Sequence, residues 1–212
     1  MTTHLIQGSD EWLAARCGKV TASRMADLLA KTKTGYGASR ANYMAELIAE
    51  RLTGVPAEKF TNAAMQWGTA NEGDARTAYE FHTDCDVTEV GFVPHPGILM
   101  AGASPDGLVA DDGLVEIKCP NTATHIDTLL SGAVAGKYVT QMQFQMACTG
   151  RAWCDFVSFD PRMPDDLRLF VRRVPRDNTA IADMEAEIVK FLAELDDKVA
   201  ALRSAKPLAR AA

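Results

Sequence analysis

Apolar residues in the first third of the chain recur three or four positions apart, which is the spacing of one helix face. Ser9 precedes the first such stretch as a cap, and Gly18 follows it as a terminator. Helices are therefore predicted at residues 9–16, from Thr21 onward, at 39–53 and at 61–82. Between them, residues 31–38 are rich in lysine, threonine and glycine, which predicts a flexible basic loop.

From residue 87 onward the pattern changes to short apolar runs bounded by turn residues, which is typical of strands. Asp111, Asp112 and Gly113 form a turn signal between two such runs and predict a β-hairpin. Strands are predicted at 87–93, 98–103, 108–110, 114–118, 153–159 and 169–174. Helical stretches are predicted after Pro120, at 139–148 and at 177–202.

This order of elements predicts the fold class. Helices come first, then strands, a helix, two more strands and a closing helix, and an α/β fold with a mixed sheet flanked by helices fits that order best. The chain has 212 residues, of which 47% are apolar and 24% charged. It is therefore long enough to bury the core of one domain.

The helix predicted at 61–82 contains Gly68 and Gly73. Each glycine costs a helix about 1 kcal/mol relative to alanine, so such glycines predict a close approach of the backbone to something else. Glu72 lies between them and is predicted to face the hairpin. An exposed helix acid is the ordinary alternative.

Composition and charge narrow the class of protein. No apolar run approaches the ~18 residues that a membrane span needs, and the start is too polar for a secretory signal, so we expect a cytoplasmic protein without a membrane partner. The five cysteines and four histidines lack the spacing of metal ligands. The formal net charge of −6 argues against nonspecific coating of DNA, although a groove with a positive local potential escapes this objection.

The hairpin carries the most informative polar residues. Side chains alternate along a strand, so Glu116 and Lys118 share one face, and Asp106 in the preceding Pro-Asp-Gly bend can turn toward it. Two carboxylates suit a hard divalent ion such as Mg²⁺, and a nearby lysine can orient water and neutralise charge on a phosphodiester. An exposed Glu-Lys pair on an ordinary hairpin is the alternative.

A second group of polar residues lies where the first two predicted helices meet. Arg16, Lys19, Ser23 and Arg24 crowd this junction. Helix N-terminal amides together with an arginine make a good phosphate cradle. A solvated corner is the alternative.

Five motifs, in this order along the chain, resemble those of one family. They are Trp12-Leu-Ala-Ala-Arg16-Cys-Gly-Lys-Val-Thr-Ala-Ser23, Trp67-Gly-Thr-Ala-Asn-Glu72-Gly-Asp-Ala-Arg76, Ser104-Pro-Asp106-Gly, Glu116-Ile-Lys118-Cys-Pro and Gln141-Met-Gln143. The family is that of lambda exonuclease and the YqaJ viral recombinases, which are phage alkaline exonucleases of the PD-(D/E)xK nuclease superfamily. The likeness extends from about Gln7 to about Asp177 and includes Asp160-Pro-Arg162-Met163.

The resemblance implies a restriction-endonuclease-like fold and a Mg²⁺-dependent 5′-to-3′ exonuclease on linear double-stranded DNA, with Mn²⁺ tolerated. It also implies release of 5′-mononucleotides, an alkaline optimum, a homotrimer and 3′ overhangs for a phage single-strand annealing protein. The site of action would be the cytoplasm of a host cell, with the gene on a phage or prophage. Within a single nuclease domain, we expect a mainly helical part at 1–83, a catalytic core at 86–175 and a C-terminal helix at 177–203.

The resemblance assigns the catalytic roles by position. Asp106, Glu116 and the main-chain carbonyl of Ile117 would bind metal. Lys118 would position the nucleophilic water, and Gln141 would help to hold it. Glu72 would support a metal ion directly or through water.

The substrate-binding roles follow in the same way. Arg16, Ser23 and Ser104 would take the 5′-phosphate. Met65 falls where the family has an apolar wedge at the terminal base pair, and Lys33 where a basic side chain approaches the minor groove. The family can show a further arginine after Cys119-Pro120, and residues 121–125 contain none, so the strength of the 5′-phosphate dependence stays open.

Two other functions fit parts of the pattern. A structure-specific or site-specific endonuclease of the same superfamily would share the hairpin, but the phosphate cradle disfavours it. A catalytically silent DNA-end-binding protein would be expected to lack an acid or the lysine. All three of those side chains are present.

Overall fold

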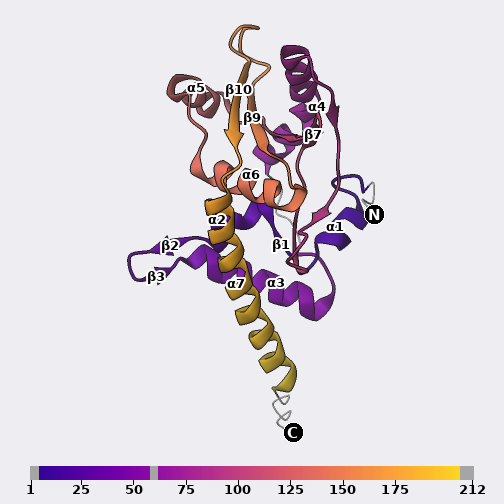
Figure 1. Cartoon of the computed structure of the whole chain (residues 1–212), viewed down its shortest axis with the longest axis vertical. Coiled ribbons are helices and arrows are strands. Elements are labelled where there is room, and N and C mark those ends of the chain that lie inside the picture. The colour runs from indigo at the N-terminus through magenta and orange to yellow at the C-terminus, as the bar shows by residue number, and fades with distance from the viewer. Residues whose placement is uncertain (1–4, 58–61, 206–212) are drawn as a thin grey trace.

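Strand β8 (Gly113–Lys118) lies in the middle of a five-stranded sheet in the computed structural model, which describes residues 5–57 and 62–205 (Figure 1). The strand order is β10-β9-β8-β7-β4. The predicted hairpin is confirmed, because β7 (Gly107–Val109) pairs antiparallel with β8 and Val109 is opposite Gly113. The other members of this sheet are β4 (Val87–Thr88), β9 (Trp153–Phe159) and β10 (Leu169–Pro175).

Strands β8 and β9 run parallel, and a parallel pair needs a long crossover connection. Helices α5 (Thr122–Ser131) and α6 (Gly136–Thr149) supply it. Helix α6 packs on the face of the sheet that presents Leu114 and Phe156. Helix α4 (Ala63–Thr83) packs on the opposite face, against Val115 and Ile117. Because both faces are covered, β8 consists of buried residues almost throughout.

A second, smaller sheet contains one strand from the N-terminal part and two from the segment before the hairpin. Helix α1 (Asp10–Arg16) begins at its predicted cap, where Ser9 Oγ accepts from the Trp12 amide at 3.2 Å. The helix predicted from Thr21 is largely replaced by strand β1 (Val20–Thr21), a 3-10 turn (Ala22–Arg24) and the single turn α2 (Met25–Leu28). Strand β1 pairs with β6 (Ala101–Ala103), and β6 also pairs with β5 (Val93–Pro94).

Two local predictions are wrong. Residues 31–38 form a hairpin of β2 (Lys31–Thr32) and β3 (Gly35–Tyr36) rather than a flexible loop. Tertiary contacts hold it, since the Tyr36 hydroxyl donates to Glu187 at 2.7 Å and the Arg40 guanidinium lies 3.8 Å from the Tyr36 ring centre. The strand predicted at 87–93 is two short strands, β4 and β5, which belong to different sheets.

The long helices agree with the pattern of apolar residues. Helix α3 (Ala38–Thr53) packs against α7 (Asn178–Ser204), with the Tyr43 and Phe191 rings 5.7 Å apart. Helix α7 extends beyond the rest of the chain in Figure 1. Helix α4 starts after the cap Asn62, and Thr61, where it was predicted to begin, lies outside the described residues.

The prediction that Gly68 and Gly73 mark a close backbone approach is wrong for the single chain. A Cβ atom added to either glycine would meet nothing within 4 Å. Gly73 is exposed, and Gly68 is half-buried on the same side of α4 as Glu72 and Ala75. In the described parts of the chain, no helix is long and apolar enough to cross a membrane.

Candidate active site

Asp106, Glu116 and Lys118 lie together at one end of the β7–β8 hairpin. The Ile117 amide donates to Asp106 Oδ2 at 2.7 Å, which fixes the carboxylate against the strand. The Lys118 ammonium is in direct contact with Glu116 Oε1. Glu116 is fully buried, whereas 29% of the Lys118 side chain is exposed, so the cluster opens toward solvent at the lysine.

Helix α6 contributes two amides to the same carboxylate. Gln141 Nε2 donates to Glu116 Oε1 at 2.6 Å, and Gln145 Nε2 donates to Oε2 at 2.6 Å. The sequence prediction included Gln141 and missed Gln145. The available signal was the spacing of four residues, which places both amides on one helix face.

We call the cluster of Asp106, Glu116 and Lys118 the acidic end of the site. Crowding of like charges shifts the pKa values of its groups. Burial and the nearby Glu116 raise the pKa of Asp106 well above its usual value. Burial also raises the pKa of Glu72, which approaches from α4 and lies 3.3 Å from an Arg76 nitrogen. For Lys118 burial opposes the charge, but Glu116 and Asp106 outweigh it and raise the lysine pKa. Lys118 is therefore an ammonium that partly balances three carboxyl groups.

These residues fit a hard divalent cation. Oxygen donors converge in a buried place with surplus negative charge, which is the chemistry that Mg²⁺ prefers. Within the described ranges, no group of three or more His, Cys, Asp or Glu side chains has the arrangement of a metal site. An ion here would thus depend on the Asp106 and Glu116 carboxylates, with a main-chain carbonyl and water completing its shell.

The basic end of the site is built on Arg16. Its guanidinium donates to Ser104 Oγ at 3.1 Å and lies 4.1 Å from the Trp12 ring centre. The Trp12 indole also donates to Ser104 Oγ, at 2.9 Å. No carboxylate of the described residues forms an ion pair with Arg16, and burial lowers its pKa. Ser104 is two residues before Asp106, so one short piece of backbone joins the two ends.

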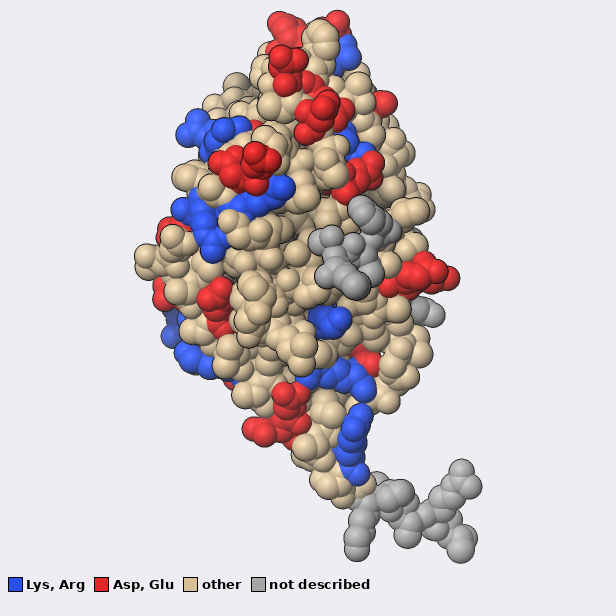
Figure 2. Space-filling view, turned by 45° about the vertical axis from the view of Figure 1, so that its right-hand side comes forward, with Lys and Arg blue, Asp and Glu red and all other residues tan. Residues whose placement is uncertain are grey.

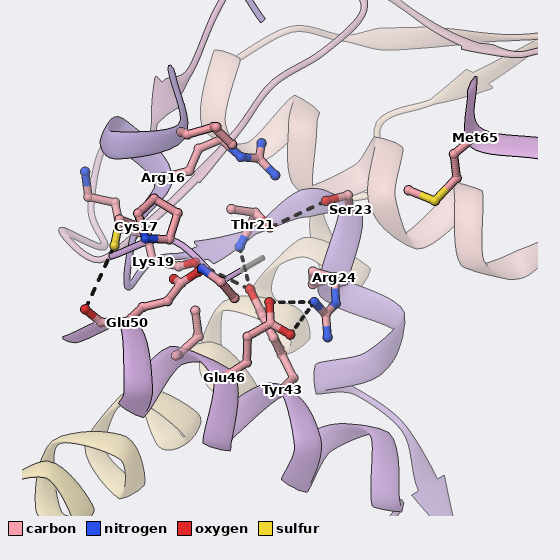
Figure 3. A pocket seen from close by; sticks show the side chains of 14 residues that line it. Arg16, Cys17, Lys19, Thr21, Ser23, Arg24, Tyr43, Glu46, Glu50 and Met65 are labelled. Carbon is pink, nitrogen blue, oxygen red and sulfur yellow. Dashed lines mark hydrogen bonds and ion pairs between the residues drawn. The ribbon is translucent and has the colours of Figure 1, made fainter. Parts of the chain in front are cut away.

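A pocket of about 460 Å³ extends from Arg16 and is shown in Figure 3. Ser23 and Lys19 line it, as the phosphate-cradle prediction requires. Met65 reaches it from α4 and is 48% exposed. Arg24 also lines the pocket, but its guanidinium is already paired with Asp27 at 2.7 Å and with Glu46 at 2.8 Å.

The structure differs from the sequence prediction of this pocket at two residues. Lys33 lies in the turn of the β2–β3 hairpin, which projects from the body in Figure 1, and it does not line the pocket. Glu50, which the sequence prediction missed, accepts from the Gly18 amide at 2.6 Å and from the Ala57 amide at 2.8 Å. It thereby ties together two segments of the pocket wall. A buried acid inside an amphipathic helix gives no sequence signal for such a role.

The negative charge of the chain is unevenly spread. On the face shown in Figure 2, acidic side chains gather toward the upper end, and basic and acidic side chains are mixed below. A net charge of −6 therefore does not prevent basic side chains from lining the pocket, where Arg16 and Lys19 lie together with Glu46 and Glu50.

The model of the YqaJ-like viral recombinase domain matches residues 11–152, which include the hairpin and the α6 amides. The chain belongs to this family. No curated protein matches it.

Among solved structures, the chain is 56% identical to an alkaline exonuclease, LHK-Exo, from Laribacter hongkongensis. The match covers 92% of this chain and 96% of that chain, with a TM-score of 0.86. The same exonuclease in complex with dAMP matches with a TM-score of 0.87. A phage-related exonuclease from Haemophilus somnus 129PT is 17% identical over 87% of this chain and 96% of its own, and its TM-score of 0.71 shows a shared fold.

The predicted family, the mixed α/β fold and the prediction of an enzyme of the nuclease class are thereby confirmed. The roles assigned to individual site residues stay predictions.

Proposed function

We propose that the protein is a Mg²⁺-dependent 5′-to-3′ exonuclease that acts on linear double-stranded DNA. The observation that carries the proposal is the direct linkage of the two ends of the site. Ser104 Oγ accepts from Arg16 at the pocket, and Asp106 two residues later belongs to the acidic cluster. A terminal phosphate held at one end would place a nearby phosphodiester at the other, which favours attack at a strand terminus over attack within a strand.

The residues would divide the reaction as follows. Asp106, Glu116 and the carbonyl of Ile117 hold the metal ion, and Glu72 supports it. A bound Mg²⁺ supplies a Lewis acid that activates water and stabilises the negative charge that develops on the phosphate. Lys118 neutralises part of that charge and, with Gln141, orients the attacking water.

The pocket residues would position the DNA. Arg16, Ser23 and Ser104 bind the 5′-phosphate, because the Arg16 guanidinium has no ion-pair partner among the described residues and a guanidinium suits a phosphate. Met65 wedges against the terminal base pair, and Lys33 approaches the minor groove. The dAMP bound to LHK-Exo is a 5′-mononucleotide, which supports 5′-mononucleotides as the products here.

The product would be a duplex with 3′ overhangs for a phage single-strand annealing protein, and the enzyme would act as a homotrimer. Membership of a viral recombinase family supports the role in recombination. The homotrimer is what the family resemblance implies. A mass of three chains in sedimentation equilibrium is the expected result for the assembly, and a monomer mass at working concentration would contradict it.

Digestion of linear duplex DNA labelled at each terminus tests the polarity. We expect early release of the 5′ label as a mononucleotide, persistence of the 3′ label in the strand, and no release in EDTA. Closed circular duplex serves as the control for endonuclease activity. Efficient nicking of circles, or earlier loss of the 3′ label, would reject the proposal.

A further inference from the structure

We propose that Lys137 binds a phosphate of the DNA strand on the 3′ side of the scissile bond, and that the Tyr138 ring holds its ammonium beside the acidic end of the site. This inference rests on the proposed function. It goes further by giving the strand that is cut a second contact, away from its 5′ terminus.

The first turn of helix α6 lies beside the acidic end. Lys118 Nζ is 5.6 Å from the Tyr138 ring centre. One turn later Gln141 donates to Glu116, so α6 runs from the lysine toward the buried carboxylate. Because the acidic end opens toward solvent at Lys118, the first turn of α6 borders that opening.

The Tyr138 ring contacts two lysines. It is fixed on β9 by stacking on Phe156, with the ring centres 5.4 Å apart. Lys137 Nζ lies 4.7 Å from the Tyr138 ring centre, which is within the range of a cation–π contact. Both ammonium groups thus lie around one aromatic ring, and positive charge extends from Lys118 to the exposed Lys137.

The charge of Lys137 is not balanced by an acid in the described parts of the chain. No carboxylate there pairs with its ammonium, and the first turn of α6 contains no acid. A lysine in this turn also lies at the positive end of the helix dipole, which favours an anion. A phosphate placed here would therefore be attracted both by the lysine and by the helix end.

The order of the strands puts Lys137 and Arg16 on opposite sides of the acidic end. Arg16 is joined through Ser104 to the segment that enters β7, whereas Tyr138 packs on β9. Strand β8, which carries the acidic end, lies between β7 and β9. A DNA strand with its 5′-phosphate at Arg16 and its scissile bond at β8 would continue toward Lys137. The next phosphate follows after about 3.4 Å of helix axis.

The test compares Lys137→Ala with Lys198→Ala, which removes the same charge from an exposed position of α7. Fluorescence anisotropy of a labelled linear duplex in EDTA measures binding without digestion at several KCl concentrations. We expect Lys137→Ala to weaken binding about 2- to 5-fold at low salt, because an exposed ion pair contributes little. The slope of log affinity against log salt concentration should become shallower by about 0.9, as expected for one lost phosphate contact. Lys198→Ala should change neither value.

Digestion in Mg²⁺ separates this role from those of Arg16 and Lys118. The loss of kcat/KM in Lys137→Ala should be equal on 5′-phosphorylated and 5′-hydroxyl ends, and kcat at saturating DNA should stay within about twofold of the wild type. Lys137→Arg keeps the charge and should restore the wild-type salt dependence.

The possible outcomes separate the inference from its premise. A salt slope in Lys137→Ala equal to that of the wild type would overturn the inference while leaving the proposed function intact. A loss confined to 5′-phosphorylated ends would do the same, because it would place Lys137 at the terminal phosphate. A wild-type protein that does not digest linear duplex from its 5′ ends would overturn the proposed function itself, whatever the salt dependence of binding.

Discussion

The acidic and basic ends of the site are prepared for opposite ligands by different means. At the acidic end, buried Glu116 on the central strand accepts hydrogen bonds from two α6 amides and pairs with one ammonium, and Asp106 accepts from the Ile117 amide. At the basic end, the contacts of Arg16 within the described residues are with an indole and a hydroxyl, and none of them is an ion pair. The acidic end thus keeps an excess of negative charge, which suits a metal cation, and the basic end keeps positive charge, which suits a phosphate. The comparison teaches that a chain with net negative charge can keep one guanidinium out of ion pairs with its described carboxylates, as a phosphate site requires.

The largest expected effect is loss of the acidic end. Asp106→Asn keeps the side-chain shape but removes a charge from the metal site, and Lys118→Ala removes the balancing ammonium. We expect DNA digestion to fall on the order of 10³-fold in each, because a metal ion contributes several kcal/mol to the transition state. Asp111→Asn, in the exposed turn of the same hairpin, is the control and should digest normally. Near-normal digestion by Asp106→Asn would remove it from the site.

A smaller and more selective effect is expected at the basic end. Arg16→Ala should slow digestion of 5′-phosphorylated ends by about 10- to 100-fold, which corresponds to one charge-assisted hydrogen bond. Ends that carry a 5′-hydroxyl should be affected less. The exposed Arg172 on the edge strand β10 provides the control variant Arg172→Ala. Equal losses on both kinds of end would show that Arg16 does not bind the phosphate.

The ion pair of Asp160 with Arg162 should affect the stability of the fold rather than the rate of DNA digestion. Buried Asp160 accepts from Arg162, whose guanidinium lies 4.2 Å from the Trp67 ring centre of α4. Burial opposes the Asp160 charge, but the Arg162 contacts outweigh it and lower its pKa to about 2. Asp160→Asn should therefore lower the free energy of unfolding by about 2 kcal/mol at pH 7.

The pH dependence of this difference has a definite sign. The folded-state pKa of Asp160 is lower than its unfolded value, so the stabilisation is complete above the unfolded value of about 4 and is lost as the pH falls toward 2. Urea unfolding of the wild type and Asp160→Asn at pH 7 and pH 3 measures it. A gap between the two proteins that stays constant over this range would show that Asp160 is not the titrating group.

The smallest effect concerns α4, which reaches both ends through Met65 and Glu72. Gly68→Ala and Gly73→Ala should each raise the free energy of unfolding by about 0.5–1 kcal/mol, because the added methyl group meets nothing and alanine favours the helix. Thermal unfolding measures this gain. If Gly73→Ala digests DNA more slowly, the exposed face of α4 contacts DNA or another copy of the chain. If only Gly68→Ala is slower, the contact lies on the side of α4 that carries Glu72. Unchanged digestion by both variants would show that neither position contacts DNA.

Much of the acidic end is readable from the sequence. Alternation along 114–118 and a turn signal place Glu116 and Lys118 on one face, since both effects act within a few residues. The place of Arg16 at the end of the first helix can be predicted as well, because Ser9 caps that helix and Gly18 terminates it. These features are local, and the structure reproduces them.

The remaining features depend on contacts between distant segments. Strand β1 exists because Val20 and Thr21 pair with Ala101 and Gly102, and residues 31–36 form a hairpin because Tyr36 meets Arg40 and Glu187. No local pattern reports such partners. Gln145 shares a helix face with Gln141, but that local pattern does not show that its partner is Glu116, 29 positions earlier.

The parallel pairing of β8 with β9 also affects when a newly synthesised chain becomes active. Glu116 leaves the ribosome before the α6 amides and before β9, which ends at Phe159. Until those later segments arrive, the acidic residues lack both the neighbouring strand and the donors that fix them. A chain that has not yet formed α6 and β9 therefore lacks the two amides and the neighbouring strand that hold Glu116 in the complete fold.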